Sequence, residues 1–274
     1  DNAFIGQESW KYNTTGSFTS FLGTLSGLSN ESGLSNVFIG KSAGYSNTSG
    51  SYNVSIGTFS GEDNNGEQNV FLGQQAGQYV QGGNYNVYLG PFTGAYNTNG
   101  DYNIFIGYGA GYNETGSNRL YIENSTNTST SALIYGEFDN NLLTFNAKVG
   151  VGTKYPGIYE LYISGDVYAS GGFYIPAAKS SKSEYKTIDN PVGKIQNLNG
   201  IFFQQESESK QESAGLFADE IEQILPSAVI TNENGEKAVD YNQLTPVLIE
   251  AIKAQQKQID DLKAEVETLK QGLK

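Results

Sequence analysis

One serine and one lysine that lie near each other in the chain have side chains of the types used in covalent catalysis. Ser181 and Lys186 stand five positions apart in a polar stretch. A serine hydroxyl can act as a nucleophile with a lysine amine as its base, provided that the surroundings lower the pKa of the lysine. The same stretch also fits a plain Ser/Lys-rich linker, and we prefer that interpretation.

Composition excludes most other catalytic and metal-binding chemistry. The chain has no Cys, no His and no Met. Disulfides, thiol nucleophiles, soft-metal sites and Ser-His-Asp catalysis are therefore excluded, and we expect no metal and no cofactor. The neighbouring carboxylates Glu62–Asp63 and Asp260–Asp261 are expected to be solvated, one pair in a turn and the other on a helix surface, rather than to form acid–base pairs.

The charge balance excludes a further class of partner. The net charge of −13 is a poor match for nucleic acid, whose phosphates require Lys and Arg. No apolar run approaches the ~20 residues that span a bilayer, so we expect no membrane insertion. Residues 1–20 do not resemble a secretion signal. The absence of an initiating methionine leads us to expect a processed product or a fragment of a longer protein.

The first half of the chain is built from a repeat. A five-residue phrase, Asn-Val-Phe-Ile-Gly in its clearest copy at 36–40, occurs seven times, with starts at 2, 19, 36, 53, 69, 86 and 103. The spacing is 17 residues, apart from one step of 16. A fixed period of this length is typical of a solenoid or stacked array.

One asparagine and two glycines keep their slots in the clear copies of the repeat. Glycine at a fixed slot indicates a positive φ or a close backbone approach. The aligned asparagines fit either a stacked hydrogen-bonded ladder or ordinary turn residues. Sequons such as Asn47-Thr48-Ser49 and Asn124-Ser125-Thr126 are interpreted as turn chemistry. The repeat slots are Asn36, Gly40, Gly44, Asn53, Gly57, Gly61, Asn69, Gly73, Gly77, Asn86, Gly90, Gly94, Asn103, Gly107 and Gly111.

The phrase predicts a strand that is covered on both faces. Val37 and Ile39 point to one side and Phe38 to the other, and both sides are apolar. A strand with one wet face would alternate apolar with polar residues. We expect one face to fill the inside of a coil and the mostly aromatic face to be covered by a neighbouring chain, which argues for an oligomer.

Each repeat therefore reads as a short strand, a turn, a second short strand and a polar turn. Such units can stack as coils ~4.8 Å apart, or lie flat as an antiparallel meander. The even period and the fixed glycine slots favour the stacked coil, and seven coils would form a rod roughly 30 Å long. The neutral surface, rich in Tyr and Asn, suits contact with sugars and equally suits an inert shaft.

The phrase, followed by Ala-Gly and by Asn-Thr-Ser-Gly, resembles the head repeats of trimeric autotransporter adhesins (YadA-like heads) and of related phage and injection-machine fibres. The resemblance covers residues 2–117. Those repeats are usually shorter than the present period, so the match is in style rather than in length. It implies three chains wound around one axis.

After residue 117 the period breaks. Three short strands are predicted at 119–122, 132–136 and 142–145, with polar turns between them. Residues 149–171 resemble a linker found before the intramolecular chaperone of endosialidase-type tailspikes and fibres. The alternation through Leu161, Ile163, Val167 and Ala169 favours another narrow, intertwined β segment, and polar residues at 176–187 indicate a domain boundary.

From about residue 181 onward the chain resembles that chaperone itself. The resemblance is carried by residues 198–203, 215–226, 239–241 and 244–252, in that order. It implies a mixed α/β domain that trimerises, folds the fibre ahead of it and ends in a coiled coil.

Many chaperones of this family cut themselves with the Ser and the Lys of a Ser-Asp-x-Arg-x-Lys pattern. Ser181 and Lys186 match its two ends, but Lys182 and Glu184 replace the Asp and the Arg. An alignment without a gap back from Ile188 would place Ser180 and Tyr185 in the two catalytic slots instead. These departures favour a retained chaperone without self-cleavage.

The residues alone predict two helices in this part. Apolar residues from Ala218 to Leu225 recur at helical spacing, and Pro226 ends that helix. Asn242 is expected to cap a second, long helix. Its a/d heptad seam favours two strands in isolated peptides, but we expect the preceding domain to hold three. The seam residues, around Gln255, are Ile252, Ile259, Leu262, Val266, Leu269 and Leu273.

These observations predict a mainly β fold with four parts. We expect a trimeric β-roll or β-solenoid of 17-residue repeats at 1–117 and a β-rich transition and neck at 118–178. A small α/β intramolecular chaperone domain would follow at 179–251, and a parallel trimeric coiled coil at 252–274.

The predicted function is structural and binding. We expect part of a homotrimeric extracellular fibre on a virion, an injection machine or a cell surface: a phage or phage-like tail fibre, or an adhesin. Its partners would be its own copies, a baseplate or upstream fibre segment, and a host or surface glycan or protein receptor. Two alternatives stay open: the stalk of a tailspike glycan hydrolase whose catalytic domain lies upstream, and a self-cleaving serine-lysine chaperone.

Overall fold

The computed structural model describes residues 1–158, 160–164, 167–170, 184–204, 212–232 and 235–272. The chain forms two compact units, Asp1–Gly150 and Val151–Lys274. The first is built on one ten-stranded sheet, and small two-stranded sheets and helices make up the second.

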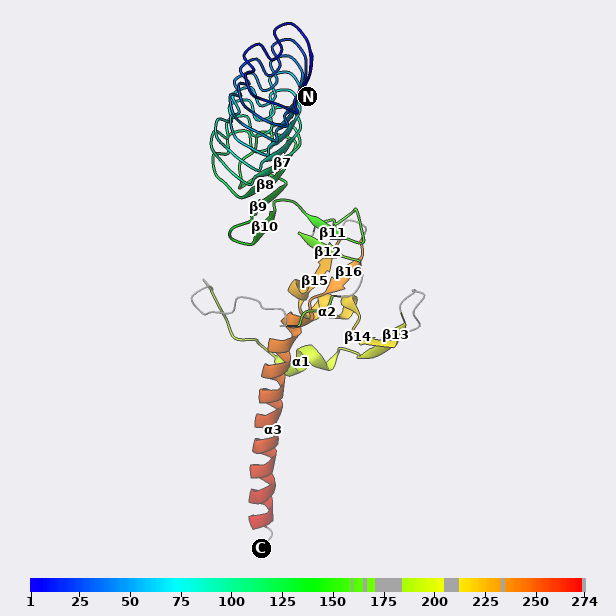
Figure 1. Ribbon diagram of the computed structural model, residues 1–274. Coiled ribbons are helices and arrows are strands. Elements are labelled where there is room, and N and C mark those ends of the chain that lie inside the picture. Colours follow the sequence, from blue (N-terminus) through cyan, green and yellow to red (C-terminus); the bar gives the residue numbers. More distant parts are fainter. Residues whose placement is uncertain (159, 165–166, 171–183, 205–211, 233–234, 273–274) are drawn as a thin grey trace. The chain divides into compact units, whose positions relative to one another are not determined.

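The first unit is a β-solenoid in which every repeat contributes one strand (Figure 1). Neighbouring strands pair in parallel and in register, so that Phe38 lies opposite Phe21 on one side and Ser55 on the other. The stacked coil is therefore confirmed over the antiparallel meander. The parallel strands are β1 (Ala3–Ile5), β2 (Ser20–Leu22), β3 (Val37–Ile39), β4 (Val54–Ile56), β5 (Val70–Leu72), β6 (Val87–Leu89), β7 (Ile104–Ile106) and β8 (Arg119–Ile122).

The second short strand predicted for each repeat is wrong, because the chain forms turns there. Ser42 has φ +55° and Gly44 has φ +58°, and left-handed residues this close together interrupt an extended run. The turn amides still bond to the next coil: the Gly44 amide donates to the Ser60 carbonyl at 3.0 Å. Each coil thus closes through turns while keeping its inter-coil hydrogen bonds.

The predicted assignment of the strand faces is also wrong: the aromatic face lies inside the coil and the aliphatic face lies outside. Phe38 and Phe105 are fully buried, whereas Ile56 is 37% exposed. The glycine-rich turn faces the ring, since a Cβ built on Gly44 would lie 2.6 Å from Cδ2 of Phe38. The coil closes on a flat ring at this point because glycine leaves room for it.

The interior rings stack along the solenoid. Ring centroids are 4.9 Å apart for Phe21 and Phe38, and 4.7 Å apart for Tyr88 and Phe105. Aromatic pairs of this kind contribute about 0.5–1.5 kcal/mol beyond the area they bury. The buried Ser55 interrupts the row, and the apolar core is accordingly divided into two clusters on either side of it.

The parallel stacking ends after β8. β9 (Ile134–Glu137) and β10 (Leu142–Phe145) continue the same sheet in antiparallel pairs. The three short strands predicted after residue 117 are therefore confirmed, and the first of them is the last parallel rung of the solenoid.

The second unit combines short sheets with three helices. Its core is formed by Ile221, Ala228 and Leu244, with partly buried leucines and valines around them. The strand pairs are β11 (Val149–Val151) with β12 (Leu161–Ile163), β13 (Ile201–Gln204) with β14 (Glu212–Gly215), and β15 (Val229–Thr231) with β16 (Lys237–Val239). The helices are α1 (Pro191–Gln196), α2 (Ala218–Ile224) and α3 (Leu244–Gly272), with 3₁₀ turns at Pro226–Ala228 and Tyr241–Gln243.

The helix predictions hold in part. α2 ends before Pro226 as predicted, and the long helix exists as α3 (Figure 1). Asn242 is not its cap: the Asp240 side chain accepts a hydrogen bond from the Asn242 amide at 3.0 Å and caps a 3₁₀ turn that precedes α3. Within the described ranges, no helix has the length and apolar character to traverse a membrane.

Candidate functional site

Only one member of the candidate catalytic pair lies in the described part of the chain, so the pair stays a prediction. Ser181 lies outside the described residues. Lys186 is exposed and lies close enough to Asp189 to help lower the pKa of that carboxyl, after the larger contribution of Lys194.

The two carboxylate pairs have structural contacts. Glu62 accepts a hydrogen bond from Gln78 at 2.6 Å, and Asp63 accepts one from the Ser46 hydroxyl at 3.0 Å, so both tie neighbouring coils together. Asp260 lies on exposed α3 and accepts from Gln256 at 2.9 Å. No cluster of three or more His, Cys, Asp or Glu suited to a metal ion occurs among the residues that the structure describes.

The asparagine that opens the phrase is buried in the five clear copies, at positions 36, 53, 69, 86 and 103, and forms a ladder along the solenoid. The Asn36 side-chain oxygen accepts a hydrogen bond from the Asn53 amide at 2.9 Å, and Asn69 accepts from the Asn86 amide at 2.9 Å. Each side-chain nitrogen donates to a glycine carbonyl, as Asn36 does to Gly50 at 2.7 Å. These residues are therefore rungs of a ladder rather than exposed turn residues.

A second buried asparagine row was missed by the sequence reasoning. It occupies the turn slot at Asn30, Asn47, Asn64 and Asn97, and Asn47 donates to the Asn30 side-chain oxygen at 2.7 Å. Its signal was present in the sequence as an asparagine that recurs near the 17-residue period. Because Asn47 is fully buried, its sequon is inaccessible in the folded chain, in agreement with turn chemistry.

The two glycine slots have different structural roles. At the first, Gly90 has φ +132°, and a Cβ there would lie 2.5 Å from the Gly107 carbonyl oxygen of the next coil. At the second, Gly94 has φ +55°, and a Cβ would lie 2.4 Å from the Tyr88 ring. The first slot permits coils to approach each other, and the second permits each coil to close on its interior ring.

The outward faces of the strands form a continuous surface that we call the outer aliphatic stripe. Its members are in register from coil to coil and are all at least partly exposed. From β3 to β7 every outward-facing side chain of the strands is Val, Ile or Leu. It consists of Val37, Ile39, Val54, Ile56, Val70, Leu72, Val87, Leu89, Ile104 and Ile106.

The predicted heptad seam lies on an uncovered face of α3. Leu262 is 59% exposed and Ile252 is 64% exposed. Ile259, Val266 and Leu269 are exposed on the same helix, while Leu273 lies outside the described residues. Exposed aliphatic residues at this spacing are the pattern of a coiled-coil seam, and the coiled coil itself stays a prediction.

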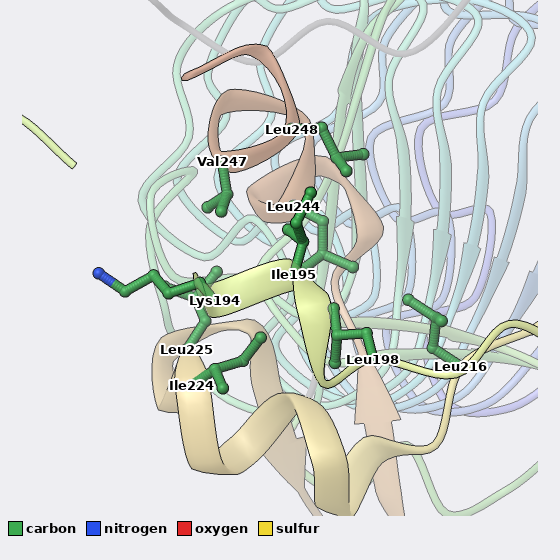
Figure 2. A pocket seen from close by; sticks show the side chains of 9 residues that line it. All are labelled: Lys194, Ile195, Leu198, Leu216, Ile224, Leu225, Leu244, Val247 and Leu248. Atoms are coloured by element: carbon green, nitrogen blue, oxygen red, sulfur yellow. The ribbon is translucent and has the colours of Figure 1, made fainter. Parts of the chain in front are cut away.

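The apolar cavity of the second unit is a packing feature. Its volume is about 40 Å³, and its lining comes from α1, α2, the start of α3 and three nearby leucines (Figure 2). The Lys194 stem forms one wall, while its amine bonds to Asp189 at 2.7 Å. Ligand pockets are usually roughly 300–1,000 Å³, so this cavity marks the joint between three helices rather than a binding site.

Comparison with known proteins adds a family context. No family model matches the chain. Over 103 residues it is 33% identical to the long tail fiber protein Gp37 of Salmonella phage S16, covering 34% of this chain and 14% of the relative. Over 180 residues it is 23% identical to Gp37 of Enterobacteria phage K3, covering 55% and 14%. Both of these relatives are long tail fibre proteins of phages.

A relative of another kind matches over a similar length. The chain is 27% identical over 154 residues to the myelin gene regulatory factor-like A protein of Dictyostelium discoideum, covering 48% of this chain and 16% of that protein. The chain thus spans only about a seventh of the length of these relatives. The tail-fibre relatives and the β-solenoid together support a protein of the phage tail-fibre type.

Proposed function

We propose that this chain is a structural and binding part of a homotrimeric phage tail fibre that attaches the virion to a host surface. The observation that carries the proposal is the outer aliphatic stripe on a solenoid of stacked coils. In a trimer, two further copies would cover this stripe, and the three α3 seams would form a parallel coiled coil.

The energetics favour such an assembly. Burying one large aliphatic side chain contributes about 1.5–3 kcal/mol, whereas association costs about 4–15 kcal/mol in lost freedom and ordering. A few side chains would not offset that cost. The stripe and the seam together offer enough of them, and in a trimer every copy contributes its own set.

The C-terminal unit would drive assembly. In this proposal residues 179–251 bring three chains together and promote folding of the fibre ahead of them, and residues 252–274 hold the trimer as a coiled coil. Two observations support this role. The second unit has a small core of its own around Ile221, and its helix α3 carries a row of exposed aliphatic residues. The partners would be two identical copies, an upstream fibre segment or baseplate, and a receptor on the host.

Native and denatured masses of the same purified sample test the assembly. A native mass of three full-length chains is expected. A native mass of one chain in a folded sample would overturn the trimer, and a denatured chain that ends near residue 181 would show that self-cleavage occurs.

Adherence of the labelled protein to a panel of enterobacterial cells tests attachment, since the phage relatives are named for Salmonella and Enterobacteria. We expect saturable binding to some strains. A trimer that binds no strain of a broad panel would contradict the attachment role.

A further inference from the structure

The last three clear coils carry an aromatic cluster on their turn segments, outside the strands that form the outer aliphatic stripe. The Tyr79 and Tyr96 rings lie 4.9 Å apart, and Tyr96 and Tyr112 lie 5.1 Å apart. Phe92 and Tyr108 lie 5.7 Å apart on the last two of these coils, and Tyr108 precedes Tyr112 by one four-residue step in the chain. We call these five residues the aromatic patch.

The fold does not require an aromatic residue in the slot of Tyr79 and Tyr96. In coils two to four the slot of Tyr79 and Tyr96 holds Ser29, Ser46 and Asp63, and those coils stack in the same register. The patch is also open to solvent, since Tyr96 is 43% exposed and Tyr108 is 48% exposed. A gathering of exposed aromatic side chains that stacking does not need indicates a binding surface.

The ring geometry leaves apolar faces free. The Tyr96 and Tyr112 planes meet at 75°, so one of the two rings presents its edge to the other and keeps both of its own faces uncovered by it. Tyrosine combines an apolar ring with a hydroxyl that both donates and accepts hydrogen bonds. The patch can therefore stack on an apolar face and bond to polar groups at its rim.

A polar cavity adjoins the patch at the end of the solenoid. Its volume is about 140 Å³, and Gly111 and Asn113, the neighbours of Tyr112 in the chain, form part of its wall. The remaining lining is Glu114, Tyr121, Thr126, Asn127, Thr128 and Ser129. It is smaller than a pocket for a whole drug-sized ligand, roughly 300–1,000 Å³, so it would take one substituent of a ligand whose remainder lies on the patch outside it.

The cavity wall is held rigidly by Glu114. One of its carboxylate oxygens accepts hydrogen bonds from the amides of Thr115 and Gly116, at 3.0 and 2.8 Å. The other accepts one from the Tyr121 hydroxyl at 2.8 Å. The amides and hydroxyls around it offer both donors and acceptors in a fixed arrangement.

We propose that the aromatic patch and this cavity form a binding site for a neutral glycan. This inference rests on the proposed attachment function and names its receptor class. A sugar ring has an apolar C–H face that stacks on tyrosine, and hydroxyls that match a cavity lined by amides and hydroxyls. The spacing of about 5 Å between successive tyrosine rings is comparable to the length of one sugar unit in an extended glycan.

Charge selects a neutral glycan over an anionic one. Residues 1–150 hold 11 acidic and 4 basic side chains. The basic residue nearest to the cavity in sequence, Arg119, is paired with Asp139 at 3.0 Å. An anionic sugar at this site would meet the Glu114 carboxylate with no lysine or arginine in the lining to offset it.

Binding to a printed panel of neutral hexose and N-acetylhexosamine oligosaccharides tests the site. The full chain is expected to bind at least one of them. Tyr96→Ser and Tyr112→Ser are each expected to weaken that binding at least roughly tenfold, the loss of one stacking contact of about 1.4 kcal/mol. Asn127→Ala should weaken it several-fold through the cavity.

Tyr12→Ser is the matched control. Tyr12 occupies the Tyr96 slot in the first coil, is 52% exposed, and lies at the other end of the repeats. Its substitution should leave glycan binding unchanged, and Tyr12→Ser and Tyr96→Ser should melt with the wild type because serine occupies this slot in other coils. Tyr112→Ser and Asn127→Ala lie outside this slot, so their melting temperatures are measured and their binding is compared only where they melt with the wild type. No binding to any panel member, or equal binding by wild type and Tyr96→Ser, would overturn the proposal.

A second arm separates this inference from the attachment role. Adherence to cells is measured after periodate, which destroys sugar diols, and after protease, which removes surface proteins. Loss with periodate and reduced adherence of Tyr96→Ser support the glycan site. Loss with protease alone would identify a protein receptor and overturn the glycan site while leaving attachment intact. Glycan binding without adherence to any cell would instead overturn attachment.

Discussion

At the scale of the residue, Asn69 tests the ladder. Its oxygen accepts from the Asn86 amide at 2.9 Å and its nitrogen donates to the Gly83 carbonyl at 2.8 Å, all fully buried. Asn69→Ala would leave both backbone groups without partners, at about 1–3 kcal/mol for each. We expect the free energy of unfolding to fall by about 3 kcal/mol, measured by chemical denaturation. Asn99→Ala, at an exposed turn position, should change it by less than about 0.5 kcal/mol; equal effects would contradict the ladder's role.

Tyr88 carries a buried hydroxyl for which no described residue offers a partner of good hydrogen-bond geometry, although the Asn103 side chain lies close enough to act on its pKa. Its neighbours above and below in the ring stack are Phe71 and Phe105. Tyr88→Phe removes an unsatisfied polar group and keeps the ring, so we expect an increase of about 1 kcal/mol in the free energy of unfolding. Tyr85→Phe, at an exposed ring, serves as the control. A loss of stability in Tyr88→Phe would mean that its hydroxyl is bonded.

Buried tyrosines should make the solenoid sensitive to alkali. Burial, followed by the hydrogen bond to Glu137, raises the pKa of Tyr135 to about 12, and burial also raises the pKa of Tyr88 and Tyr121. The unfolded value is about 10. The folded state therefore holds these protons more tightly, so the stabilisation is complete below about pH 10 and is lost as the pH rises toward about 12.

The alkaline effect is measured as the unfolding midpoint in denaturant across that window. Tyr135→Phe, which cannot ionise, should lose less stability than the wild type between the same two pH values. Identical slopes for the two proteins would show that Tyr135 titrates normally in the folded chain.

At the scale of the element, a substitution at Gly90 tests whether glycine is needed there for the close approach of neighbouring coils. Gly90→Ala forces a Cβ to 2.5 Å from the Gly107 carbonyl at φ +132°. We expect a loss of at least about 2 kcal/mol, from backbone strain and from displaced coils. Gly82→Ala is the matched control, since its nearest atom is the Asn99 side-chain oxygen at 3.3 Å and its φ is not left-handed. Thermal melts of both variants decide the point, and similar melting temperatures would refute it.

The sequence predicted the elements best where the period carried the information. The stacked coils, the three strands after residue 117 and the end of α2 all followed from spacing and from turn residues. The α1 helix was missed, although Asn190 followed by Pro191 is a readable start signal: the Asn190 side chain accepts from the Gly193 amide, and proline occupies the first turn.

Which strand face lies inside was not readable from the pattern. Both faces of Val37-Phe38-Ile39 are apolar, so alternation gives two equivalent solutions. The choice depends on Gly44, which lies against the Phe38 ring only after the coil closes. The missing second strand has a similar cause, because positive φ at non-glycine residues such as Ser42 and Phe59 is not marked by their types.

The candidate glycan site was predictable only in part. Recurrent tyrosines in a neutral surface were visible and suggested contact with sugars. The cavity was not visible, because it forms where residues 126–129 lie against Gly111 and Glu114, a contact between segments separated in the chain. The position of Ser181 stays a prediction, since it lies outside the described residues.

At the scale of the whole molecule, the α3 seam should control assembly. Leu262→Lys places a charge in the proposed coiled-coil core, and we expect the native mass to fall toward a single chain as concentration is lowered. Asp261→Lys, one position along the same exposed helix and outside the seam, should leave the trimer intact. Sedimentation of both variants across a concentration series measures the effect, and equal masses would exclude α3 as a trimer contact.

The hydrogen bonds between coils have a mechanical consequence. They run from one coil to the next, as from the Val54 amide to the Asn69 carbonyl at 2.8 Å and from the Gly57 amide to the Ile39 carbonyl at 2.7 Å. A force that pulls the end coil away from the next one therefore acts on the hydrogen bonds of one pair of coils at a time. Each coil that detaches releases 16 or 17 residues, roughly 60 Å of extended chain, while the coils behind it keep their own contacts. Under tension the solenoid would lengthen in steps, and each step would dissipate the work needed to break the contacts of one coil.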